Sequence, residues 1–187
     1  MERNVLEKVL TKKLDNYLKR YPNEKEKITK TLHLLANDND CFKRTNWDGH
    51  FTASAWIVDK SRKWTLMTHH KQLNIWLQLG GHAEDNSNLL EVALKEAKEE
   101  SGINNFNIIS EEIFDLDIHK IPKYGSNPEH LHYDVRFILE ADKLEKLSIS
   151  TESNDLAWIK IEDVLNLNRK KSIKRMMHKF VNQFLRS

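Results

Sequence analysis

The chain has 187 residues, 39% of them apolar and 31% charged, which is the composition of an ordinary globular protein without a membrane-spanning stretch. Its net charge of +2, from 30 basic and 28 acidic side chains, gives no reason to expect non-specific nucleic-acid binding. With Cys41 as the single cysteine and no signal-peptide pattern at the N-terminus, we expect a cytoplasmic protein without internal disulfides.

The first predicted elements are helical. Apolar residues recur at helical spacing over residues 4–37, with a break at Tyr21-Pro22-Asn23. Alternation and turn residues then predict a strand from about His50 and a turn at residues 59–62. The remaining expected elements are, in order, a strand over 64–68, a helix over 88–101, strands over 107–119 and 130–140, a strand over 157–161 and a basic amphipathic helix over 169–186.

This order of elements predicts an α/β fold in which helices cover both faces of a mixed sheet. We divide the chain into an N-terminal helical segment, residues 1–45, and a main domain, residues 46–187. Three roles are open to the N-terminal helices: a lid, a homodimer contact or neither. The last helix has basic side chains that we interpret as a solvated face: Lys170, Lys171, Lys174 and Arg175.

The helix over residues 88–101 has clear end signals. Asn88 and Glu91 have capping-box spacing, and Gly102 is suited to a left-handed C-cap. Since each residue advances about 100° around a helix axis, the apolar residues of this segment share one face, which we expect to pack on the sheet. An adjacent arc of the same helix presents three carboxylates: Glu96, Glu99 and Glu100.

Three carboxylates on one arc repel one another, and they have two interpretations. They form either a solvated acidic surface or a site for a hard divalent cation, Mg²⁺ or Mn²⁺, which takes oxygen ligands. The glycine pair Gly80-Gly81 precedes the helix and would let the backbone approach a phosphate or a metal closely. The combination of glycine turn, capped helix and acidic arc favours the metal site.

These residues resemble a known family. Gly81, followed by Lys95-Glu96-Ala97-Lys98-Glu99-Glu100-Ser101-Gly102-Ile103, is similar to the Nudix box, G-x5-E-x7-R-E-U-x-E-E-x-G-U, in which U is aliphatic. The resemblance extends over residues 50–165 and leaves the N-terminal helices outside. It implies a Nudix-type α/β/α sandwich with a mixed sheet and an extra N-terminal helical segment. It also implies a divalent-metal-dependent hydrolase that cleaves a phosphoanhydride bond in a nucleoside diphosphate-linked or similar small-molecule diphosphate.

The resemblance assigns roles to individual residues. The metal ligands that it implies are Glu96, Glu99 and Glu100, with Mg²⁺ or Mn²⁺ as the cofactor. Lys95 would orient these glutamates, and either Glu96 or Glu152 would remove a proton from the attacking water. The catalytic residues expected on this basis are therefore Glu96, Glu99, Lys95 and Glu152.

Two positions depart from the box. Ser87 stands where the pattern has its first glutamate, and Lys95 stands where it has arginine. In the family this pair helps to hold the loop against the helix, and a lysine keeps the charge but not the planar fork. Glu84 or Asp85 is a candidate to replace the missing contact. The departures motivate an alternative function, a non-catalytic Nudix-like module that senses a nucleotide.

Polar residues outside the box alternate along two predicted strands. One face of the first has Asp115, Asp117 and His119, and one face of the second has His130, His132, Asp134 and Arg136. These faces either look at water, line a substrate cleft, or place two histidines and an aspartate in a transition-metal site. For the cleft, the expected substrate contacts are Gly81, His82, His132 and Arg136. An isomerase acting on an isoprenoid diphosphate is a more remote alternative, because the chain offers no candidates for the additional acid–base residues.

Overall fold

In the computed structural model, which describes residues 2–185, two helices come first, and the strands follow in two groups separated by one helix, with the last helices at the end. The helices are α1 (Glu2–Arg20), α2 (Lys25–Asn37), α3 (Leu89–Ser101), α4 (Val164–Leu167) and α5 (Lys171–Phe180), with 3-10 turns at Pro22–Glu24 and Ile161–Asp163 and a π-helical turn at Val181–Leu185. The strands are β1 (His50–Asp59), β2 (Trp64–His70), β3 (Ile75–Leu77), β4 (Leu79–His82), β5 (Asn107–Ile121), β6 (His130–Ala141) and β7 (Ser153–Lys160).

Strand β1 organises the sheet because it pairs along both of its edges. On one edge it runs parallel to β6 over its whole length, from His50 opposite His132 to Asp59 opposite Ala141. On the other edge, β4 pairs antiparallel with the first half of β1, and β2 pairs antiparallel with its last residues. The sheet has the order β3-β2-β1-β6-β5, with β4 attached to β1 and β7 to β2. The sheet is therefore mixed, and it forks along β1.

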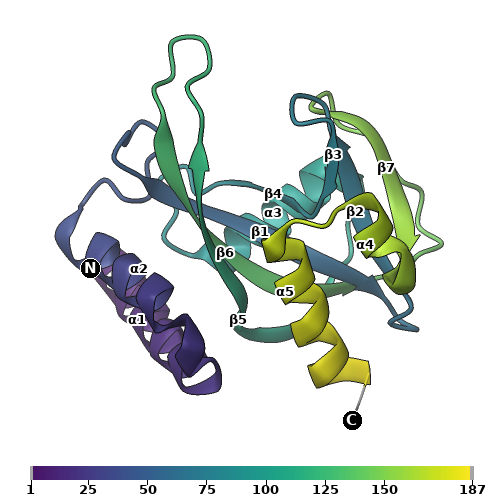
Figure 1. The fold of residues 1–187 in the computed structure, drawn as a ribbon, viewed down its shortest axis with the longest axis horizontal. Helices are drawn as coiled ribbons and strands as arrows, with labels where there is room; N and C mark the ends of the chain where they lie inside the picture. Colours follow the sequence, from purple (N-terminus) through teal and green to yellow (C-terminus); the bar gives the residue numbers. More distant parts are fainter. Residues whose placement is uncertain (1, 186–187) are drawn as a thin grey trace.

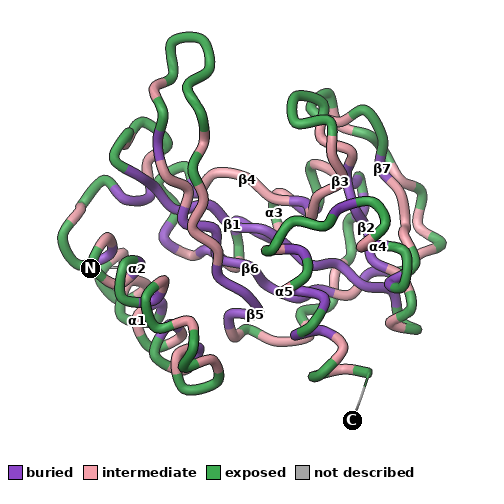
Figure 2. Tube along the Cα trace, in the orientation of Figure 1, coloured by how far each residue is buried: buried purple, intermediate pink, exposed green. Residues whose placement is uncertain are grey.

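Helices cover both faces of this sheet (Figure 1). Ala55 of β1 packs in a core cluster with Ala97 of α3, whereas the next residue, Trp56, packs in a cluster with Met176 of α5. Helices α1 and α2 lie beside the edge strand β5 and share the core on the α3 side. The buried residues follow the centre of the sheet (Figure 2). This arrangement confirms the α/β/α sandwich with added N-terminal helices.

The predicted elements are confirmed, but the sequence pattern misses two strands. Strand β3 has only three residues, and β4 contains Gly80 and Gly81, which have low strand propensity. Strand β7 begins at Ser153, earlier than expected, and the expected end of the last helix, Arg186, lies outside the described residues. Over residues 2–185, no helix is both long and apolar enough to cross a membrane.

A buried ionic network connects α1, the sheet and α5. Asp115 of β5 is 0% exposed, and its carboxylate accepts hydrogen bonds from Arg136 at 3.1 Å, Arg175 at 2.8 Å and Lys179 at 2.7 Å. The hydroxyl of Tyr17 on α1 lies 3.4 Å from the same carboxylate. The expectation of a solvated basic face is therefore wrong for Arg175, which pairs with the sheet. The other three basic side chains are exposed: Lys170, Lys171 and Lys174.

Candidate functional site

The helix α3 begins and ends where its sequence signals place it. The side chain of Asn88 accepts a hydrogen bond from the backbone N–H of Glu91, with 3.5 Å between the two atoms. The carboxylate of Glu91 does not complete a capping box, because it accepts from the amide of Asn86 instead. Gly102 has φ 74°, the left-handed C-cap that ends the helix. These caps define the ends of α3, and its buried face, which includes Ala93 and Ala97, sets the direction of its acidic arc.

Two of the three predicted ligands lie directly against the glycines of β4. The carboxylate of Glu100 accepts a hydrogen bond of 2.8 Å from the backbone N–H of Gly80. A side chain at Gly81 would overlap the carboxylate of Glu96, and one at Gly80 would lie 2.6 Å from the carbonyl oxygen of Ala53. Glycine is therefore required at both positions, because only a residue without a Cβ allows such close approach. The third predicted ligand, Glu99, is exposed on the next turn of α3.

The electrostatics of this cluster fit a cation. Burial raises the pKa of Glu100 to about 7, and the charges of Glu96 and Glu152 act in the same direction. Burial also raises the pKa of Glu96, against the charge of Lys95 and with the charges of Glu99 and Glu152. Carboxylates that disfavour one another's charged form provide the hard oxygen donors that Mg²⁺ and Mn²⁺ prefer. The carboxylate donors, and the glycines that let two of them lie against β4, therefore fit a divalent cation.

The other predicted catalytic residues surround the same cluster. Glu152 lies in the loop before β7, where its backbone oxygen accepts a hydrogen bond of 3.0 Å from Lys71. Its charge acts on both Glu96 and Glu100, so the fold brings it near the cluster. The ammonium of Lys95 lies 3.9 Å from the Glu96 carboxylate and 3.6 Å from the Glu99 carboxylate. A lysine at this position therefore still faces two of the glutamates.

The missing glutamate of the box is not replaced by its acidic neighbours. Ser87 is 7% exposed, so a small buried side chain occupies that position. Glu84 pairs with Arg44 at 3.2 Å and Asp85 pairs with Arg3 at 3.4 Å, and neither pairs with a basic residue of α3. Glu84 nevertheless adds its charge to the cluster, since it raises the pKa of Glu96. Sequence reasoning missed this contribution because the turn after β4 brings Glu84 back towards α3.

We expect the affinity of the site for Mn²⁺ to rise with pH. Because the pKa of Glu100 is raised to about 7, this carboxyl holds a proton below that pH, and the proton must leave before a cation binds. Calorimetric titration with Mn²⁺ about one pH unit below and above this value should therefore show tighter binding at the higher pH. The Glu100→Gln variant should lose most of this dependence. An equal affinity of the wild-type protein at both pH values would remove Glu100 from the ligand set.

The residues predicted to contact substrate fall into two groups. Gly81 belongs to the carboxylate cluster, whereas His82 and His132 lie together at the start of β1, with ring centroids 5.0 Å apart. Arg136 is 3% exposed, and its guanidinium pairs with Asp115, Asp117 and Asp134, so in this arrangement it has no free face for a phosphate.

The interpretation of these polar faces as solvated is wrong. His130, Asp134 and Arg136 of β6 are all buried. Beside them, the hydroxyls of Thr52 and Ser54 on β1 donate to the Asp134 carboxylate. The parallel pairing of β1 with β6 creates this contact, and neither strand's own sequence reveals it. Alternation therefore identified the face, and the neighbouring strand determines what covers it.

A mixed sheet between helical layers, with an acidic helix over a glycine-containing strand, defines an α/β/α sandwich with a carboxylate site. Residues 49–180 match the family model described as the NUDIX domain. The chain therefore belongs to the Nudix family. No curated protein sequence matches the chain significantly.

Solved structures share this fold. A NUDIX-family hydrolase from Clostridium perfringens is 27% identical, with a TM-score of 0.52 over 70% of this chain and 95% of that one. The dihydroneopterin triphosphate pyrophosphohydrolase of E. coli is 16% identical, with a TM-score of 0.57 over 71% and 94% of the two chains. An Ap4A hydrolase from C. elegans is 17% identical, with a TM-score of 0.52 over 70% and 96%. At such low identity the last two show the fold alone.

Proposed function

We propose that this enzyme hydrolyses a phosphoanhydride bond in a nucleoside diphosphate-linked or similar diphosphate substrate, with Mg²⁺ or Mn²⁺ as its cofactor. The observation that carries the proposal is the placement of the Glu96 and Glu100 carboxylates against the glycines of β4, with Glu99 exposed beside them on α3. The names of two solved neighbours, an Ap4A hydrolase and a dihydroneopterin triphosphate pyrophosphohydrolase, support this substrate class. The match to the NUDIX domain supports it at the level of the family.

Each acidic residue has a distinct part in this proposal. Glu96, Glu99 and Glu100 would hold the cation, which when bound offsets phosphate charge and lowers the pKa of water. Glu152 accepts the proton of the attacking water, since it comes from the loop before β7 rather than from α3 and its charge reaches the cluster. We assign this role to Glu152 rather than Glu96 because the Glu96 carboxylate already lies against Gly81. Lys95 positions Glu96 and Glu99 through its charge.

Substrate binding in this proposal uses the backbone and the neighbouring imidazoles. At Gly81 the missing side chain lets the Glu96 carboxylate lie against the backbone of β4, and the same backbone would approach a phosphate beside the glutamates. His82 is the next residue of β4, and burial lowers its pKa to about 4, so its ring is neutral at physiological pH. A neutral imidazole donates one hydrogen bond and adds no charge. His82 and His132 therefore contribute orientation to substrate binding rather than charge neutralisation.

The proposal predicts hydrolysis that depends on a divalent cation. Purified protein should be incubated with nucleoside triphosphates, nucleotide sugars and dinucleoside polyphosphates, each with Mg²⁺, with Mn²⁺ or with excess EDTA. Chromatography of the products should show a nucleoside monophosphate or inorganic phosphate released from at least one substrate, and EDTA should reduce release to background. Oxygen-18 water would place the label on a product phosphate, as expected for attack by water on phosphorus.

The alternative function, a nucleotide sensor that does not hydrolyse its ligand, predicts a different result in the same samples. If no compound is cleaved while one of them still raises the melting temperature of the protein, the chain binds nucleotides without hydrolysing them. Release that persists undiminished in EDTA would contradict the proposed cofactor and leave the hydrolase itself intact. The panel thus separates the activity from its metal dependence.

A further inference from the structure

Five histidines from four strands meet at the start of β1. The parallel register places His50 of β1 beside His132 of β6, and antiparallel pairing places His119 of β5 on the other side of His132. Ring centroids lie 4.8 Å apart for His50 and His132, 5.1 Å for His50 and His130, and 5.0 Å for His130 and His132. His82 of β4 completes the group, 5.3 Å from His50. None of these rings belongs to the carboxylate cluster of α3.

Two backbone carbonyls determine which ring nitrogens carry protons. The Nδ1 atom of His50 lies 3.0 Å from the carbonyl oxygen of Asn46, and Nδ1 of His130 lies 2.8 Å from that of Pro128. A carbonyl oxygen only accepts, so each Nδ1 is the protonated nitrogen and each Nε2 has a free lone pair. This pairing of a carbonyl with the remote nitrogen is the usual support for a metal-binding histidine.

The ring nitrogens of the three histidines are close enough to share one ion. The Nε2 atoms of His130 and His132 are 3.1 Å apart, and one ring nitrogen from each of His50, His130 and His132 lies within 4.8 Å of the others. Tetrahedral zinc, with Zn–N distances of about 2.0–2.1 Å, separates its ligand nitrogens by about 3.3 Å. Small rotations of these rings are therefore enough to bring all three nitrogens onto one ion.

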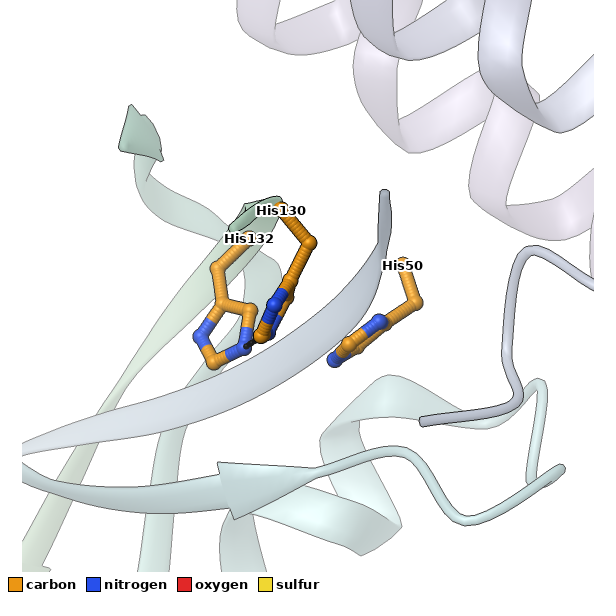
Figure 3. A group of neighbouring side chains, drawn as sticks. All are labelled: His50, His130 and His132. Atoms are coloured by element: carbon orange, nitrogen blue, oxygen red, sulfur yellow. Dashed lines mark hydrogen bonds between the residues drawn. The ribbon is translucent and has the colours of Figure 1, made fainter. Parts of the chain in front are cut away.

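The surroundings of the rings favour a ligand over mutual hydrogen bonding. Figure 3 shows the rings of His50, His130 and His132 turned towards a common space. His132 is able to satisfy His130 by donating from Nε2, but Nε2 of His50 is buried and has no hydrogen-bond partner among the described residues. A buried lone pair without a donor is costly unless something else occupies it.

We propose that His50, His130 and His132 form a second metal site, which binds one transition-metal ion of the Zn²⁺ class. Imidazole nitrogen suits Zn²⁺ and its neighbours in the transition series, whereas Mg²⁺ prefers oxygen, so the two sites differ in the ions they select. The ion would join β1 to β6, with His82 of β4 beside two of its ligands. This site uses none of the glutamates of α3, but it shares His132 with the proposed substrate-binding residues, so metal uptake and not turnover is the measurement that tests it.

The site predicts stoichiometric zinc binding that depends on these histidines. Protein without a histidine tag, stripped by a chelator, should take up one Zn²⁺ per chain in competition with a chromophoric chelator, at micromolar or lower concentration. His50→Asn and His132→Asn should each weaken binding by at least about 100-fold, since even the partners that support a ligand change metal affinity by 10–100-fold. His33→Asn, which removes an exposed histidine of α2, should bind as the wild type does. Glu100→Gln should also retain the zinc.

Several results would contradict the proposed zinc site. No uptake at micromolar Zn²⁺, loss in Glu100→Gln but not in the histidine variants, or equal weakening in His33→Asn would each overturn the proposal. X-ray absorption on the wild-type protein needs no variant to fold, and it should show a nitrogen shell at about 2.0–2.1 Å. A shell of oxygen alone would contradict a histidine site. Neither measurement depends on turnover, so the outcome is separate from that of the proposed hydrolysis.

Discussion

Replacing Glu99 or Glu100 with glutamine is expected to reduce kcat by on the order of 10³-fold while leaving the fold intact. Stabilisation of phosphate charge by a bound cation is worth several kcal/mol, and each 1.4 kcal/mol corresponds to a factor of ten in rate. Glu99 is exposed, so its loss removes no packing. At Glu100 the amide oxygen of glutamine still accepts the hydrogen bond from Gly80. The loss should therefore lie in cation binding and turnover rather than in stability.

A matched control lies on the same helix. Glu91→Gln changes an exposed carboxylate in the first turn of α3, whose hydrogen-bond partner is Asn86, and should retain wild-type turnover. Steady-state kinetics at saturating Mn²⁺ should be combined with calorimetric Mn²⁺ titration and thermal unfolding of all three variants. Unchanged turnover in Glu99→Gln or Glu100→Gln would remove that residue from the metal site. A loss of turnover in Glu91→Gln would show that the effect is not specific to the cluster.

The Asp115→Asn variant is expected to lose about 3–5 kcal/mol of unfolding free energy, the range found when one partner of a buried ion pair is removed. Burial alone would raise the pKa of Asp115, but Arg175, Arg136 and Lys179 hold it below its ordinary value. Asparagine fills the same space without the charge. It leaves the buried cations Arg136 and Lys179 with less compensation, and this uncompensated charge is the source of the loss.

Urea denaturation monitored by tryptophan fluorescence would measure this difference. Asp15→Asn makes the same chemical change on the exposed face of α1 and should alter stability by no more than about 0.5 kcal/mol. A loss below about 1 kcal/mol for Asp115→Asn would show that Asp117 and Asp134 suffice for the buried cations. The slope of the transition should stay the same in all variants, because the surface exposed on unfolding does not change.

The sequence predicted those parts of the site whose signals are local. Asn88 and Gly102 define the ends of α3, and the spacing of Glu96, Glu99 and Glu100 defines its acidic arc; both come from one continuous segment. The histidine group is different. Alternation places His130 and His132 on one face of one strand, but His50 joins them only through a parallel pairing between strands that are far apart in the chain. Short-range sequence patterns do not reveal the register in which two distant strands pair.

The same limit explains why the contacts of the buried charged residues were not predicted. A helical pattern makes Arg175 one of several basic residues on an amphipathic helix, and only the packing of α5 against β5 shows that it faces Asp115. Strand β4 escaped prediction because glycine weakens the strand signal, although Gly80 and Gly81 are there for close approach to the neighbouring strand and α3. Sequence reasoning thus identified the chemistry of the acidic site and missed the contacts made by distant strands.

Tyr17 and Glu24, from the N-terminal helical segment, bind the same buried Lys179 that pairs with Asp115 of the sheet. A lid has to detach at a small cost in free energy. Detaching these helices would leave the Lys179 ammonium with fewer partners and would expose Leu14 and Tyr17, which are both fully buried. We therefore expect local opening at this end to cost nearly as much free energy as global unfolding. The amide protons of α1, β5 and α5 belong to one cooperative unit and should exchange with solvent at similar rates.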